Sequence, residues 1–179
     1  TANFVWFNQT PTPGASNYLP HPAIVVNEIL THTDPPLEDA IEVHNRSSQP
    51  VDLGGWYLSN TSDHLKRCVI PPNTVVPAGG FGMLYEDLFN PLPGSTDNFT
   101  LNSAHGDTVY LTEVNAGGAL TGYRAAAQVG AAFNGESFGR VETSLGVDWA
   151  RVSARTVRLG TPSGVGQFRT GGGRTNAGP

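Results

Sequence analysis

Three carboxylates lie close together in the segment "HTDPPLED", residues 32–39. Asp34, Glu38 and Asp39 would share one short loop, and carboxylate oxygens are ligands that Ca²⁺ prefers. The loop lacks the alternating Asp, Asn and Gly residues of known calcium-binding loops. The pattern therefore favours a solvated acidic loop, with a calcium site at these three residues as the alternative.

A second acidic pair could support general acid–base chemistry. Glu28 and Glu42 fall on two neighbouring expected strands, and glycosidases use two carboxylates about 5–10 Å apart. We expect a structural role instead, with Glu42 facing solvent and Glu28 at a strand end, accepting hydrogen bonds from backbone amides. The pair then carries no catalysis.

Other catalytic arrangements lack their motifs. Ser59, Asp63 and His64 could be assembled into a triad, but the sequence has no G-x-S-x-G elbow. The five histidines show none of the spacings of a preorganised metal site. Cys68 is the only cysteine, so an intrachain disulfide and a cysteine-based metal site are excluded. Its apolar neighbours predict a small buried side chain.

The composition narrows the class of protein. Charged residues make up only 14% of the chain, whereas there are 22 Gly and 14 Pro, which favour turns and short strands over helices. The net charge of −5 argues against nucleic-acid binding, which requires a basic surface. No apolar run is long enough to predict a membrane span.

The sequence divides into three parts. Residues 1–22 are Pro-rich and predict a linker, or the end of a preceding module. Residues 23–159 predict one domain, and the Gly-rich residues 160–179 predict a flexible tail. The chain begins with Thr1 rather than Met, so we expect a piece of a longer protein with adjacent modules.

Short alternating runs dominate the predicted domain. In "AIEVHN", residues 40–45, Ile41 and Val43 would share one face and Glu42 and His44 the other. Similar runs recur up to "LTGYRAAAQVG", residues 120–130, and helical turns are expected only at "YEDLF" and within "RAAAQ". About seven short strands at this spacing predict an all-β, antiparallel β-sandwich.

Four segments in order carry a family resemblance. They are "IVVNEIL", "DAIEVHNRSSQPVDLGGWYLSN", "IPPNTVVPAGGFGMLY" and "HGDTVYLTE". Together they resemble the lamin tail domain, an immunoglobulin-like β-sandwich of nuclear lamins and of many secreted or surface bacterial proteins. A Pro-rich segment in place of a coiled coil makes the bacterial, multi-domain type the closer likeness. The resemblance implies no catalytic residues. Trp56 is the expected core anchor, with Leu53 and Leu58 beside it.

The sequence thus predicts a non-catalytic module of a larger, exported protein, located outside the cell or at its surface. It would bind a protein, polysaccharide or surface, or act as a spacer. The alternative is an accessory domain of a secreted hydrolase or nuclease. Aromatic side chains supply contact area at a low entropy cost, and the candidates here are Trp6, Tyr18, Phe89 and Tyr123. No cofactor is predicted beyond the possible Ca²⁺.

Overall fold

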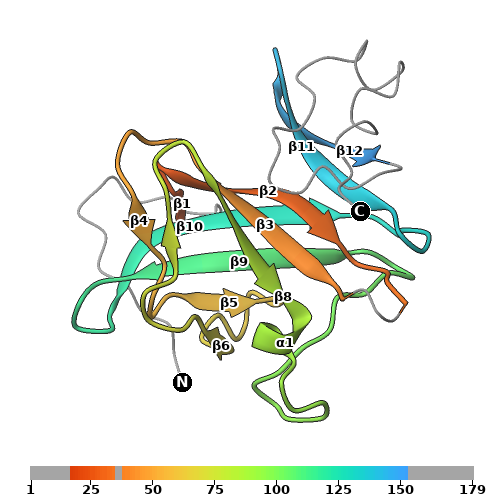
Figure 1. Ribbon diagram of the computed structural model, residues 1–179, viewed down its shortest axis with the longest axis horizontal. Coiled ribbons are helices and arrows are strands. Elements are labelled where there is room, and N and C mark those ends of the chain that lie inside the picture. Colours follow the sequence, from red (N-terminus) through yellow and green to blue (C-terminus); the bar gives the residue numbers. More distant parts are fainter. Residues whose placement is uncertain (1–16, 35–37, 153–179) are drawn as a thin grey trace.

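The described part of the chain is a β-sandwich with one short helix at its side (Figure 1). A computed structural model describes residues 17–34 and 38–152. Within these ranges the strands form two sheets of five strands and a small sheet of two. The all-β fold expected from the short alternating runs is therefore confirmed.

The first sheet is antiparallel except at one edge, where β1 runs parallel to β10. Asn115 N–H bonds Ala119 C=O across the β9–β10 turn, in which Gly118 has a φ of 75°. Only glycine adopts that conformation without strain, so "NAGGAL" forms the expected hairpin. In spatial order the strands are β1 (Leu19–Pro20), β10 (Leu120–Val129), β9 (Asp107–Val114), β5 (Tyr57–Ser59) and β6 (Cys68–Val69).

The second sheet is antiparallel throughout. Its edge strand β8 (Phe81–Tyr85) leads directly into the helix, α1 (Glu86–Phe89). The separate two-stranded sheet pairs β4 (Val51–Asp52) with β7 (Val75–Val76). In spatial order the strands of the second sheet are β12 (Gly146–Val152), β11 (Ser137–Thr143), β2 (Ile24–Leu30), β3 (Ala40–Asn45) and β8 (Phe81–Tyr85).

The core lies between the two large sheets and follows the predicted alternation. Ile41 and Val43 of β3 are fully buried. Leu53 and Leu58 are also fully buried, and Trp56 beside them is 4% exposed. The predicted core anchor and its two neighbours are confirmed. Burial of a tryptophan ring removes about 150–250 Å² from water, so this cluster contributes strongly to stability.

A β-bulge in β2 changes the face on which the following residues lie. Val26 pairs with Val43 and Glu28 pairs with Glu42, so Asn27 has no residue opposite it. The extra residue turns Glu28 away from the core and brings Ile29 into it. Glu28 and Glu42 consequently share the outer face of the second sheet.

Several expectations about local structure are corrected. "RAAAQ" continues strand β10 and contains no helical turn, whereas the turn expected at "YEDLF" is present as α1. The hairpin β11–β12 was not anticipated. Leu19 and Pro20, expected in the linker, form β1. Residues 1–16 and 153–179, with Trp6 and the Gly-rich segment, lie outside the described residues, and the domain boundaries stay predictions.

Candidate binding groove

The three candidate calcium ligands have different surroundings. Asp39 is buried and accepts a hydrogen bond from Thr33 Oγ1 at 2.9 Å. Burial raises the pKa of Asp39 to about 6, with Glu86 adding to the rise, while Thr33 and His32 lower it. Asp34 and Glu38 are exposed. Within residues 17–34 and 38–152, no three His, Cys, Asp or Glu side chains are grouped to hold a metal. The calcium site stays a prediction.

The two glutamates do pair across neighbouring strands, but both are buried. Glu28 is 2% exposed and Glu42 is 1% exposed, so the expectation that Glu42 faces solvent was wrong. Asn27 Nδ2 donates to Glu42 Oε1 at 2.8 Å, and Ser137 Oγ donates to Glu28 Oε1 at 2.6 Å. Glu28 lies within β2 rather than at its end, and it accepts from a side-chain hydroxyl, so the expected strand-end position was wrong. Side chains this buried offer no surface to a polysaccharide substrate.

The nucleophilic side chains weighed above also have structural partners. Ser59 is fully buried, and its hydroxyl bonds the backbone carbonyl of His64 at 2.9 Å. Cys68 is buried as expected, its thiol contacts the carbonyl of Leu88 at 3.3 Å, and burial raises the pKa of the thiol. A higher pKa reduces the thiolate fraction, so this thiol is poorly suited to nucleophilic chemistry.

One lateral side of the sandwich, between β8 and β6, is closed. We call it the closed side (Figure 1). Here α1 follows β8 and brings Phe89, which is fully buried, against the ring of Phe99, with centroids 4.9 Å apart. Arg67 then bonds the carbonyl of Asn98 at 2.6 Å. Phe89 is part of the core, so its expected role as an exposed contact residue was wrong.

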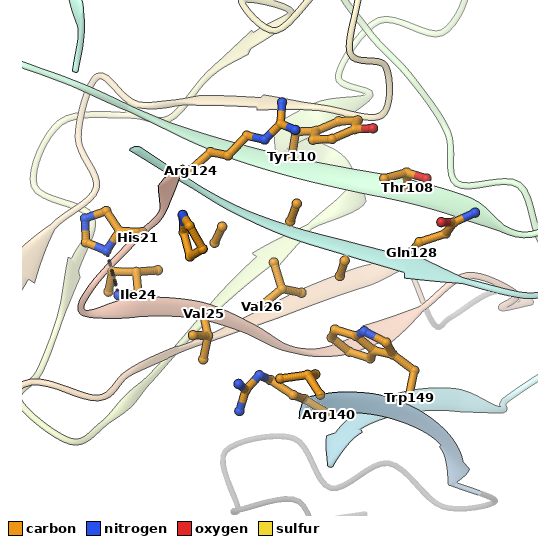
Figure 2. A pocket seen from close by; sticks show the side chains of 15 residues that line it. His21, Ile24, Val25, Val26, Thr108, Tyr110, Arg124, Gln128, Arg140 and Trp149 are labelled. Atoms are coloured by element: carbon orange, nitrogen blue, oxygen red, sulfur yellow. Dashed lines mark hydrogen bonds between the residues drawn. The ribbon is translucent and has the colours of Figure 1, made fainter. Parts of the chain in front are cut away.

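The opposite lateral side is open and forms a groove with a volume of about 460 Å³ (Figure 2). We call it the side groove. It forms because β11 pairs with β2 only as far as Gly139 opposite Glu28, and β1 pairs with β10 only at Tyr123 and Arg124. The lining residues are Pro20, His21, Ile24, Val25, Val26, Thr108, Tyr110, Arg124, Ala125, Ala126, Ala127, Gln128, Arg140, Val147 and Trp149.

His21 fixes the turn between β1 and β2 at one end of the side groove. Its Nδ1 accepts hydrogen bonds from the backbone N–H groups of Ala23 at 3.1 Å and Ile24 at 2.8 Å. Its ring lies against Trp56, with centroids 4.9 Å apart. Burial lowers the pKa of His21, while Glu113 raises it. A neutral ring suits an Nδ1 atom that accepts two hydrogen bonds.

Two arginines line the side groove, although the whole chain is acidic. Arg124 and Arg140 line it, and no Asp or Glu of the described ranges does. Arg124 lies over the ring of Tyr110, 4.7 Å from its centroid. Arg140 contacts Glu142 at 2.7 Å, and this contact and Arg46 lower the pKa of Glu142. The arrangement offers cations and strand edges, which suit binding rather than bond cleavage.

The sequence did not predict that the residues lining this groove form one site. Tyr18 and Tyr123, the two contact candidates near it, are half-buried, and Arg124 lies over the Tyr18 ring at 4.8 Å. The available signal was the alternation in "GVDWARV", where Val147 and Trp149 share a face. It predicts a strand but not the departure of its hairpin from the sheet.

Comparison with known families supports the fold. The model of the Lamin Tail Domain family matches residues 20–131, which is more than half of the chain. The chain belongs to the lamin tail domain family. This lamin tail domain is thus an immunoglobulin-like module from a family of non-catalytic domains. The family match ends before β11, so the hairpin that forms one wall of the side groove lies outside it.

No curated protein and no solved structure gave a significant match to the chain. In the described ranges, no helix has the length and apolar character needed to cross a bilayer.

Proposed function

We propose that this lamin tail domain is a non-catalytic binding module of a larger, exported protein, and that the side groove is its binding surface. One observation carries the proposal: the side groove, with its two arginines, lies where strand edges find no partner strand among residues 17–34 and 38–152. Unpaired edges invite association with other chains, and proteins normally cover or charge them. An edge left inside a shaped groove is better suited to a ligand.

A matched pair of variants tests the binding role. Ala126→Trp places a large ring in the side groove at an exposed position, whereas Leu145→Trp places the same ring at a site that is 98% exposed and outside the groove. Binding of the immobilised chain to a panel of polysaccharides and extended peptides would be measured by interferometry. We expect Ala126→Trp to weaken binding at least about tenfold and Leu145→Trp to leave it unchanged.

Two outcomes would contradict the proposal. If nothing on the panel binds, the domain is better explained as a spacer, the other role that its family and linker composition allow. If both variants bind as the wild type does, the binding surface lies elsewhere. Export is tested separately, by a secretory leader in the full-length gene and recovery of the protein outside the cell. A catalytic domain in that gene would instead support an accessory role in a hydrolase or nuclease.

A further inference from the structure

We infer that the side groove takes an extended, acidic polypeptide segment, which adds as a strand to the edge of β10 at Ala126 and Gln128. This inference rests on the proposed function and specifies its ligand. The backbone geometry of β10 selects the site, and the charge of the lining selects the peptide.

The edge of β10 continues beyond its partner. The N–H of His21 donates to the carbonyl of Arg124 at 2.9 Å, so the polar backbone groups of Arg124 point away from β9. Along a strand, the N–H and C=O groups of every second residue point to the same edge. Ala126 and Gln128 therefore direct their backbone groups into the side groove, because β1 turns away at His21.

Two features make this edge accessible. Ala126 and Gln128 are exposed, and none of the described residues hydrogen-bonds their backbone groups on this side. The run Ala125–Ala127 also carries only methyl side chains, so no long side chain of these residues reaches over the edge at which a strand would pair at a spacing of about 4.8 Å. The side chains of the added peptide that face the protein would then lie near Val26 and Trp149, which line the same groove.

The facing edge of β2 is a poorer template. The carbonyl of Ala23 points toward β3, where it accepts from the N–H of Arg46 at 2.8 Å. The backbone N–H of Ile24 therefore points toward the side groove, where it donates to His21 Nδ1 at 2.8 Å (Figure 2). That bond blocks one end of the β2 edge. β10 is the edge that can receive a strand.

Charge selects an acidic segment. Arg124 and Arg140 stand on different walls of the side groove, and the described lining contains no acidic side chain, in a chain of net charge −5. Carboxylates near both walls would meet complementary charge, which governs association rate and specificity. A polysaccharide fits less well, because Arg124 covers one face of the Tyr110 ring and Trp149 is half-buried. Sugars need such faces open for stacking.

The test is a titration of the ¹⁵N-labelled full chain followed by NMR. The probe is the peptide acetyl-Asp-Val-Thr-Val-Thr-Val-Asp-amide, and its counterpart carries Lys in place of both Asp residues. We expect the acidic peptide to shift the amide signals of Ala126 and Gln128 and to slow their hydrogen exchange. It should bind at least about tenfold more tightly than the Lys peptide at low salt.

Variants separate the groove charge from a general charge effect. Arg140 and Arg46 both contact Glu142, at 2.7 and 3.0 Å, but only Arg140 lines the side groove. Arg140→Gln should weaken binding of the acidic peptide about threefold to tenfold, and Arg46→Gln less than twofold. Ala126→Pro removes the N–H that a new strand would use. This variant should abolish the peptide-induced shift of the Gln128 amide, while the other amide signals report that the fold is retained.

Three results would overturn the inference. The amides of Ala126 and Gln128 could remain unchanged at millimolar peptide, the two peptides could bind equally, or these amides could be protected before any peptide is added. The last result would mean that another segment or a second copy already occupies the edge. A polysaccharide that binds without shifting these amides would leave the proposed function intact and remove only the peptide ligand.

Discussion

The two lateral sides of the sandwich show different solutions to one problem. Each side is a gap where the edges of two sheets approach. On the closed side, α1 and the Phe89–Phe99 pair fill the gap, and Cys68 Sγ contacts the carbonyl of Leu88 across it. On the open side, the strands that could cover the gap separate from their neighbours, at Arg124 and at Gly139. The same fold therefore packs one gap with aromatic side chains and leaves a groove at the other.

Substitution of one large aromatic side chain on each side should show the greatest contrast. Phe89 is fully buried, so Phe89→Ala should lower the free energy of unfolding by about 3–5 kcal/mol. Trp149 is half-buried at the side groove, and Trp149→Ala should cost about 1 kcal/mol. Urea denaturation followed by circular dichroism measures both. Equal losses would mean that the open side is as tightly packed as the closed one.

His21 holds the turn between β1 and β2 on the open side through hydrogen bonds. His21→Ala removes the acceptor of two backbone N–H groups and should cost about 1–2 kcal/mol at pH 8. Burial lowers the pKa of His21 below its usual 6.5, so the unfolded chain binds a proton more readily. The wild type then loses this contribution as the pH falls below 6.5, and the two stability curves should converge. A difference that stays constant from pH 8 to pH 5 would contradict this account.

Asp39 should behave in the opposite sense, near the closed side. Its carbonyl accepts from the N–H of Glu86 at the start of α1, and its carboxyl has a pKa raised from 3.8 to about 6. The ionised carboxylate is destabilising above pH 6, and this penalty fades as the pH falls toward 3.8. Asp39→Asn should therefore stabilise the protein by about 1–2 kcal/mol at pH 7, after screening by solvent.

The pH dependence of the stability difference serves as the control for Asp39→Asn. Thermal melts of Asp39→Asn and the wild type should differ most at pH 7 and coincide near pH 3.5. A variant that is less stable than the wild type at pH 7 would show that the ionised carboxylate has a compensating partner.

Calcium should have the smallest effect. A ligand that binds only the folded protein at about 100 times its Kd adds roughly 2.7 kcal/mol. Because Asp39 is buried and bonded to Thr33, we expect millimolar Ca²⁺ to leave the melting temperature of EDTA-treated protein unchanged. A clear rise, lost in Asp34→Asn and Glu38→Gln, would establish the calcium site predicted at Asp34, Glu38 and Asp39.

The core between the two sheets was easier to predict from sequence than the side groove. Leu53, Trp56 and Leu58 could be placed because they alternate around a glycine turn in a motif of the family. Phe89 could not, because whether an aromatic residue in a helical turn faces the core or solvent depends on where the turn is docked. The β-sandwich itself follows from strand periodicity, which is a local property of the chain.

The side groove depends on how strands end, and no local pattern encodes this. The bulge at Asn27 moves Glu28 to the outer face, and alternation alone would have placed it with Val26. Glu42 was correctly expected opposite Ile41 and Val43, but that outer face is itself buried. Sequence periodicity assigns a residue to a face, whereas burial of that face is decided by segments distant in the chain.

The parallel pairing of β1 also has a mechanical consequence. β1 is held to β10 by two register pairs, followed by the bond from His21 N–H to the carbonyl of Arg124. Tension applied to the chain before Leu19 reaches this short strand before it reaches β2. Release of β1 would extend back to Tyr123 the edge of β10 that no described strand pairs. A pull on this end of the domain would therefore lengthen the edge to which, in our proposal, a ligand strand adds.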